Sequence, residues 1–127
     1  ACSMKETDRI VELFLICAKN NLIVEVDRND LRNYFFEATK MEQFQPLLTF
    51  YHWNENELCL KLELEINDLI VNKKITEYEN YLYIYNIPSN YLNEFDKEII
   101  SLIDQMVLNF VKFNMKNQEK KPKIKVD

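Results

Sequence analysis

The sequence contains no glycine among its 127 residues. Average usage of about 7% would supply roughly nine in a chain of this length. Phosphate-cradling loops, dinucleotide-binding fingerprints and nucleophile elbows all need glycine, because the backbone there turns sharply or closely approaches a ligand. Its absence therefore excludes these three kinds of site.

Histidine and cysteine are scarce as well. His52 is the only histidine, and Cys2, Cys17 and Cys59 lack the paired spacing of a zinc site. We therefore expect no metal and no cofactor. Sparse, unpaired cysteines are typical of a reducing compartment, where thiols pack as small apolar side chains, so we expect a cytoplasmic protein.

Long hydrophobic runs are also missing. No apolar run approaches the 18 or so residues that a membrane span needs, and Glu12 interrupts the stretch from 10 to 18. Four of residues 5–9 are charged, where a signal peptide would be apolar. The sequence therefore predicts neither a membrane partner nor an export signal.

Charge is unevenly distributed along the chain, whose net charge is −5. Residues 112–127 hold six lysines against Glu119 and Asp127, and the other 111 residues hold 10 basic and 19 acidic side chains. A body with a net charge of −9 disfavours nucleic acid as a partner, because it does not attract a phosphate backbone. We expect one compact domain over residues 1–114 and a disordered, lysine-rich tail over 115–127.

Two helices are predicted in the N-terminal third. Residues 3–6, Ser-Met-Lys-Glu, have the form of a capping box before apolar residues that recur at helical spacing to Ala18. Asn20-Asn21 is expected to end this helix, because asparagine tolerates the left-handed conformation. A strand over 22–26 should follow, and Asp27 should cap a second helix. The apolar face of that helix would comprise Leu31, Tyr34, Phe35 and Ala38.

The middle of the sequence is more ambiguous. Pro46 is expected to stop any helix there, and residues 47–51 fit a strand or a buried loop. Residues 58–70 fit both the strand period and the helical period, but leucine and glutamate favour a helix. Leu60 and Leu64 would lie opposite its main apolar face, which predicts a helix buried on two faces.

Residues 81–85, Tyr-Leu-Tyr-Ile-Tyr, form the clearest predicted strand, after a turn at Glu79-Asn80. Strand alternation places Tyr81, Tyr83 and Tyr85 on one side. Core and cross-strand packing is the ordinary role of such residues, but exposed tyrosines are also common at protein interfaces. These three tyrosines are therefore candidate partner-binding residues.

The last helix is expected to begin at residues 88–90 and to continue to Phe113. From Tyr91 it would span about 35 Å, at about 1.5 Å per residue, which is longer than a core of this size can cover. Phe110 and Phe113 should then be left for another chain, which predicts a homodimer or a partner contact through this helix.

Residues 66–76, Ile-Asn-Asp-Leu-Ile-Val-Asn-Lys-Lys-Ile-Thr, followed by 81–85, resemble the end of a winged-helix domain. In that family the third helix ends in an apolar pair, followed by a short polar turn, an isoleucine or valine, and a β-hairpin wing. The resemblance implies a recognition helix over 58–72 and a wing over 75–87. Lys73 would replace the usual turn glycine, and residues 40–59 would be an insertion between the second and third helices.

Charge bears on what such a domain would bind. A DNA-reading helix needs basic and amide side chains directed at phosphates and bases, yet residues 55–80 hold seven acidic and three basic residues. DNA binding would require basic residues to gather on one face, for example Arg28, Arg32, Lys73 and Lys74. Without that, the charge favours contact with a protein.

The fold class predicted is therefore α+β: a small winged-helix-like domain with two N-terminal helices, a short antiparallel hairpin and a long C-terminal helix. His52 has no apparent nucleophilic partner, so we expect no enzyme. The leading hypothesis is a non-enzymatic protein-interaction module, a subunit or inhibitor within a larger assembly that presents an acidic surface. The alternative is a dimeric winged-helix DNA-binding transcriptional regulator.

Overall fold

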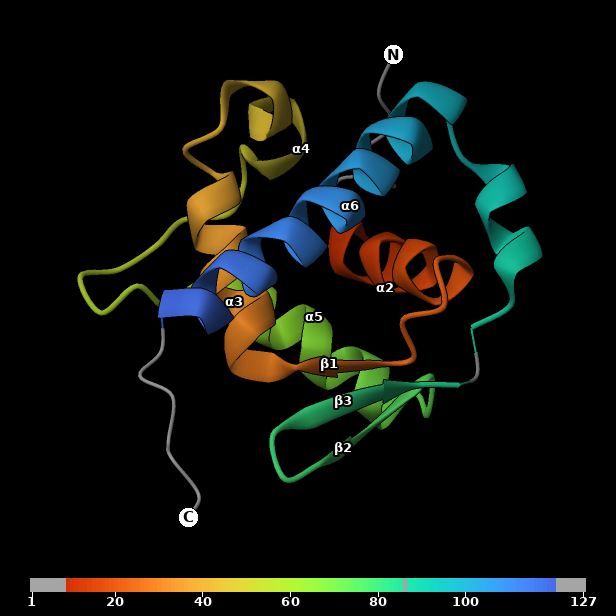
Figure 1. Ribbon diagram of the computed structural model, residues 1–127. Coiled ribbons are helices and arrows are strands. Elements are labelled where there is room, and N and C mark those ends of the chain that lie inside the picture. The colour runs from red at the N-terminus through yellow and green to blue at the C-terminus, as the bar shows by residue number, and fades with distance from the viewer. Residues whose placement is uncertain (1–8, 86, 121–127) are drawn as a thin grey trace.

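The computed structural model describes residues 9–85 and 87–120. Within these residues it contains five α-helices and a three-stranded antiparallel sheet, which confirms the predicted α+β class. Figure 1 shows helix α2 (Ile10–Asn20) inside the molecule, with the long helix α6 (Lys97–Lys120) crossing over it and the sheet on the other side. No helix among the described residues is both long and apolar enough to cross a membrane.

Helix α2 is the centre of the core. Every residue from Ile10 to Ala18 is buried, including Glu12. The helix contacts α6, α5 (Leu60–Val71), β3 (Tyr81–Ile84) and the 3-10 helix η2 (Ser89–Glu94). The predicted apolar face is therefore only part of its buried surface, since a helix enclosed by other elements is apolar all round. The predicted capping box at 3–6 lies outside the described residues.

Two helices end with a non-glycine residue in the left-handed conformation, where glycine is the usual residue. After α2, Leu22 takes the left-handed conformation with a φ of 66°, whereas Asn21 has a φ of −98°. The Ile23 amide donates to the Ala18 carbonyl at 2.9 Å, the wide hydrogen bond of a Schellman motif. The prediction that an asparagine would take this position is therefore wrong. Lys73, with a φ of 60°, takes the equivalent position after α5.

Strand β1 (Glu25–Asp27) leads directly into helix α3 (Arg28–Ala38). The Asp27 carboxylate accepts hydrogen bonds from the amides of Asn29 at 2.7 Å and Asp30 at 3.1 Å, which confirms the predicted cap. The predicted apolar face is confirmed too. Its buried residues are Leu31, Tyr34, Phe35 and Ala38.

The segment between α3 and α5 contains helical turns where a strand or loop was expected. The 3-10 helix η1 (Glu42–Phe44) is followed by the four-residue helix α4 (Gln45–Leu48). Pro46 lies in the first turn of α4 and does not stop it, because an amide hydrogen is not needed there.

Helix α5 confirms the helical reading of residues 58–70. It buries Leu62, Ile66 and Leu69. Leu60 and Leu64 remain 73% and 53% exposed, so the prediction of burial on two faces is wrong. The second apolar face lies on the surface.

The hairpin of β2 (Ile75–Tyr78) and β3 turns at Glu79-Asn80 as predicted. Both turn residues have positive φ values, 50° and 76°, which is the signature of a type I′ turn. Strand β3 also pairs with β1, so the strand order is β1-β3-β2. Leu82 is buried while Tyr81 is exposed, as the alternation predicts.

Helix α6 begins later than predicted. The 3-10 helix η2 occupies the expected start, and the Asp96 carboxylate then accepts a hydrogen bond from the Glu98 amide at 2.8 Å. The helix runs to Lys120, past the expected end near Asn114. Of the predicted tail over 115–127, the structure describes only residues 115–120.

Phe110 belongs to the core and is only 4% exposed. Its ring centroid lies 5.5 Å from that of Phe14 and 5.3 Å from that of Tyr34. Phe113 is half-buried, 5.6 Å from Tyr34. The expectation that the core would leave Phe110 uncovered is wrong, because α3 contacts α6 and supplies Tyr34. A partner contact through the partly exposed Phe113 stays a prediction.

Candidate interaction surfaces

Helix α5 presents an apolar outer face. Leu60, Leu64 and Val71 are 73%, 53% and 76% exposed, and their spacing places them along one side of the helix. Asn67 and Asp68 are exposed between them. We call Leu60, Leu64, Asn67, Asp68 and Val71 the α5 face.

The arginines of α3 lie beside α5 and are held by carboxylates. Glu63 Oε1 accepts from Arg32 Nη2 at 2.6 Å and from Arg28 Nη2 at 3.3 Å. Arg28 Nη1 also donates to Glu77 Oε2 at 2.8 Å. The two arginines therefore gather as the DNA-binding hypothesis requires, but two carboxylates balance their charge.

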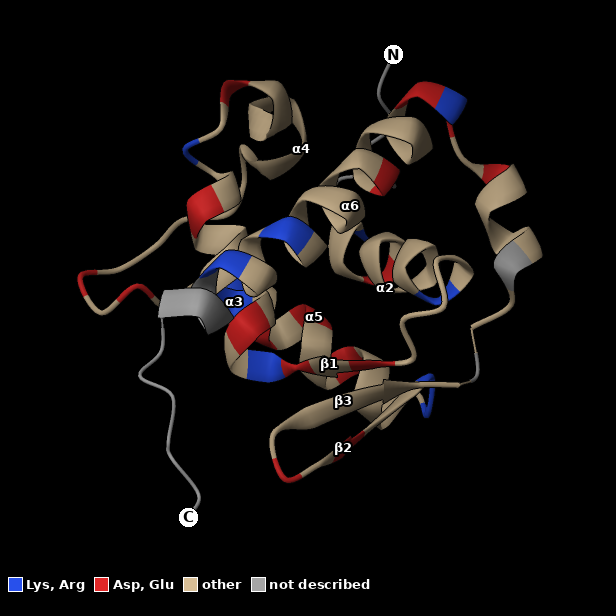
Figure 2. Cartoon of the chain, viewed as in Figure 1, with Lys and Arg blue, Asp and Glu red and all other residues tan. Residues whose placement is uncertain are grey.

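Lysines near α5 are also engaged. Lys74 Nζ donates to Glu12 Oε2 at 2.6 Å, and Lys61 Nζ lies 3.7 Å from Glu65 Oε2. Figure 2 shows acidic residues on β1 and at the tip of the β2–β3 hairpin, where Glu79 lies. This side of the molecule therefore combines apolar and acidic side chains.

The outer side of the sheet is rich in tyrosine. Tyr78, Tyr81 and Tyr85 are 65%, 42% and 47% exposed, and Tyr83 is half-buried between them. The partner-binding residues predicted from the sequence include three of these tyrosines and leave out Tyr78. The hairpin turn could have revealed it, because a two-residue turn at 79–80 places Tyr78 opposite Tyr81. We call Tyr78, Tyr81, Tyr83 and Tyr85 the tyrosine face.

Carboxylates border the tyrosine face. Glu25 on β1 is opposite Tyr83 in the sheet register, and Glu79 lies at the hairpin tip. Burial raises the pKa of Tyr83, and the carboxylates of Glu25 and Glu79 raise it further. These carboxylates therefore place negative charge beside Tyr83.

The distal part of α6 exposes a different stripe from the predicted one. Leu108, Val111 and Met115 are 50%, 37% and 60% exposed at helical spacing, while Phe110 points into the core. A dimer formed through this end of α6 would use that stripe and not Phe110.

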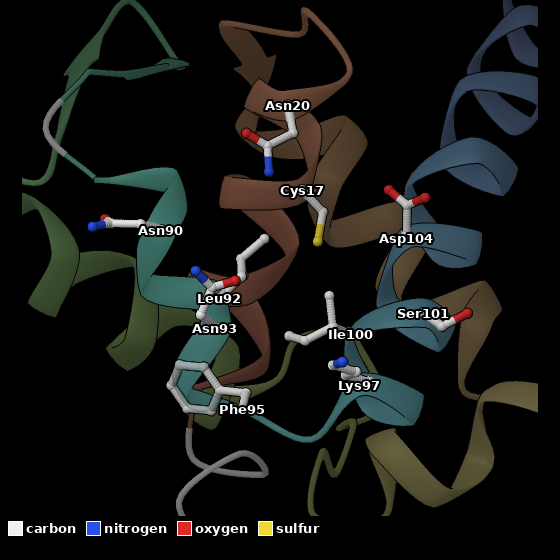
Figure 3. Close-up of a pocket in the computed structure, with 10 residues that line it drawn as sticks. All are labelled: Cys17, Asn20, Asn90, Leu92, Asn93, Phe95, Lys97, Ile100, Ser101 and Asp104. Carbon is white, nitrogen blue, oxygen red and sulfur yellow. The ribbon is translucent and has the colours of Figure 1, made fainter.

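A hollow of about 910 Å³ lies between α2, η2 and α6. Figure 3 shows the Cys17 sulfur directed toward it, with Leu92 from η2 and Ile100 and Asp104 from α6 around it. Burial, with a smaller contribution from the Asp104 carboxylate, raises the pKa of Cys17 to about 12. The thiol is therefore protonated at neutral pH and is a poor nucleophile.

The single histidine of the sequence lies apart from this hollow. His52 is exposed and lines a separate hollow with Thr49 and Trp53. Among the described residues, no group of three or more His, Cys, Asp or Glu side chains could hold a metal ion. No family model, curated protein or solved structure matches the chain.

Proposed function

We propose that this chain is a non-enzymatic protein-interaction domain, a subunit or inhibitor within a larger assembly, which presents an acidic and apolar surface. Helices α2, α3 and α5 followed by the β2–β3 hairpin occur in the order that the winged-helix resemblance implies. Elements η1 and α4 lie within the expected insertion at 40–59. In this proposal α5 and the hairpin retain a recognition role, but their target is a protein.

The α5 face supports this proposal most directly. A helix that reads DNA presents basic and amide groups. The α5 face has one amide, Asn67, which Arg28 Nη2 binds at 3.1 Å, and it otherwise exposes Leu60, Leu64 and Val71 beside Asp68. Burying exposed leucines against another protein is favourable, because it removes apolar area from water. The bordering carboxylates favour a target segment that has basic side chains at its edges.

The DNA-binding alternative has less support. Arg28 and Arg32 are 12% and 21% exposed at their side chains and share Glu63. To contact phosphates they would have to leave these short hydrogen bonds, and Glu63 would lose both partners. The positive charge of the two arginines is therefore neutralised by ion pairs within the domain and contributes little attraction for DNA.

The cysteines support a cytoplasmic location as part of the same proposal. Cys17 and Cys59 are free and buried in the core. Unpaired buried thiols are typical of proteins that work in reducing compartments. The high pKa of Cys17 also supports a non-catalytic role for this thiol, which lines the hollow between α2, η2 and α6.

Site-specific photo-crosslinking tests the proposed function. A benzophenone side chain replaces Leu64 on the α5 face, and a control places it at the exposed Gln105 on α6. Crosslinking is done in cells that naturally express the protein. We expect a protein adduct from position 64 that resists nuclease and disappears when Leu60→Asp is added. The control position should not give that adduct.

A second measurement separates protein from DNA as the target. Duplex DNA titrated at low salt should bind weakly and without sequence preference, because the body of the protein is acidic. A nuclease-sensitive adduct at position 64, or a tight, sequence-selective DNA complex that Arg28→Gln weakens, would overturn the proposal in favour of the DNA-binding regulator.

A further inference from the structure

The tyrosine face lies on the β2–β3 hairpin and the residue after it, whereas the α5 face lies on a helix. In the sheet register Tyr78 pairs with Tyr81, and Tyr83 lies between Thr76 and Glu25. Leu82, Ile84 and Ile75 point to the opposite side, into the core. The phenol rings therefore project from a rigid sheet whose other side is fixed by packing.

Acidic groups lie beside Tyr81 and Tyr83, whereas Lys19 Nζ donates to the Tyr85 carbonyl at 3.2 Å at the other end of the face. Glu25 and Glu79 act on Tyr83, and Asp27 follows Glu25 by two residues and lies opposite Tyr81. The Asp27 carboxylate also caps α3, so it is held in place. A ligand on this surface meets aromatic ring faces and negative charge together, a combination that attracts cations.

Three other aromatic rings of the protein have a lysine or arginine side chain over the ring. Lys40 Nζ lies 4.2 Å from the centroid of the Phe36 ring, and Lys61 Nζ lies 5.1 Å from that of Tyr51. Arg9 and Lys74 both lie 5.9 Å from the ring centre of Tyr91. Within the described part of the chain, no lysine or arginine lies over Tyr78, Tyr81 or Tyr85 in this way.

We propose that the tyrosine face binds an arginine-rich segment of another protein. The proposal rests on the proposed protein-binding function but uses other residues than those of the α5 face. Charge complementarity is the basis for choosing this occupant, since Glu25 and Glu79 border the rings and the body of the chain is acidic.

Arginine fits this surface better than lysine. A guanidinium group is planar, so it can stack on a phenol ring while its N–H groups donate to a carboxylate beside the ring. A lysine ammonium is more strongly hydrated and makes point contacts. The proposal therefore predicts that affinity depends on which cation the segment carries and on the aromatic faces, as well as on net charge.

Fluorescence anisotropy with labelled synthetic peptides tests this binding. Four probes are compared: an arginine-rich peptide, the same peptide with lysine, the same peptide with glutamate, and the chain's own residues 115–127. We expect the arginine peptide to bind several-fold more tightly than the lysine peptide and the glutamate peptide to show no binding. NMR amide shifts should concentrate at residues 76–85 and at Glu25.

Matched variants separate ring faces from charge. Tyr78→Leu combined with Tyr81→Leu keeps apolar area but removes the aromatic faces, and we expect about a tenfold loss of affinity. Tyr78→Phe with Tyr81→Phe keeps the faces and should bind like the wild type. Glu25→Gln should weaken binding and reduce its salt dependence. Circular dichroism shows whether each variant is folded. If the leucine pair is unfolded, the phenylalanine pair and Glu25→Gln still test the binding.

Several results would overturn the proposal. Equal affinity for arginine and lysine peptides, with shifts spread over all acidic surfaces, would mean non-specific electrostatic attraction only. Tight binding of residues 115–127 at the same place would make a copy of this chain the occupant. If the peptides do not bind but the adduct at position 64 persists, this inference fails and the proposed function stands. If the peptides bind but position 64 gives no adduct, only the role of the α5 face is contradicted.

Discussion

The Lys74 ammonium donates a 2.6 Å hydrogen bond to the Glu12 carboxylate and so connects the end of α5 to the central helix. The Glu12 side chain is 7% exposed, whereas that of Lys74 is 39% exposed. Glu12 is the only charged residue among the buried residues described. The lysine therefore compensates a carboxylate that the core would otherwise exclude.

Removing Lys74 should cost more stability than neutralising Glu12. Lys74→Met leaves a buried carboxylate without this partner, and we expect a loss of about 2 kcal/mol, below the usual cost of a fully buried pair because Lys74 is partly exposed. Glu12→Gln should cost less, because Lys74 can then turn to water. The double change Glu12→Leu with Lys74→Met should recover most of the loss. Denaturant unfolding measures all three, and equal losses for Lys74→Met and Glu12→Gln would contradict this account.

Glycine at a left-handed position should stabilise this glycine-free protein. Lys73 has a φ of 60°, which is costly for a residue with a Cβ atom. Lys73→Gly should raise the free energy of unfolding by about 0.5–1 kcal/mol, after the entropy gained by the unfolded chain is subtracted. Asn72→Gly is the matched control and should lower it, since Asn72 has a φ of −81° and has no such cost to relieve. A shift of the urea midpoint in the same direction for both variants would refute the explanation.

Local hydrogen-bonding rules account for what the sequence predicted well. The Asp27 side chain binds amides two and three residues ahead, so the start of α3 depends on a short segment only. The hairpin likewise follows from a two-residue turn between strands of alternating residues, which also placed Tyr81, Tyr83 and Tyr85 on one side. These features need no knowledge of distant packing.

Distant packing accounts for what the sequence could not give. Whether Leu60 is buried depends on another element covering it, and its residue type does not report that. The Arg28–Glu77 pair joins residues 49 positions apart, so its effect on the charge of the α5 region is invisible in a local count. The last helix is predicted to begin at residues 88–90, whereas η2 occupies that segment and Asp96 accepts a hydrogen bond from the first turn of α6.

Substituting Phe110 should lower the stability of the protein far more than substituting Leu108. Phe110→Ala removes a core ring that packs on Phe14 and Tyr34, and we expect a loss of about 3–5 kcal/mol. Leu108→Ala changes a half-exposed residue and should change stability by less than about 0.5 kcal/mol. Thermal and denaturant unfolding measure both. A folded Phe110→Asp variant of unchanged stability would restore the original interface hypothesis.

Sedimentation tests what remains of that hypothesis. If α6 mediates a dimer, Leu108→Asp or Val111→Asp should shift the protein to monomer without lowering its unfolding midpoint, because both side chains are on the surface. Gln105→Asp adds the same charge one turn before the Leu108–Met115 stripe and should weaken the association less. A wild-type protein that is monomeric at high concentration would contradict self-association through this helix.

The Cys17 thiol should make stability fall at alkaline pH. Its pKa rises from 9.0 to about 12 in the folded protein, mainly through burial. Above about pH 9 the unfolded chain loses this proton while the folded protein keeps it, so the contribution is complete below pH 9 and is lost as the pH rises toward 12. One such group lowers the free energy of unfolding by at most about 1.4 kcal/mol per pH unit in this window.

Cys17→Ala also creates a cavity, but that cost does not vary with pH, and other titrating groups such as Tyr34 are present in both proteins. The difference between the wild type and Cys17→Ala, measured by denaturant unfolding from pH 8 to 11, should therefore shrink above pH 9, and curves that stay parallel would show that the thiol ionises alike in both states.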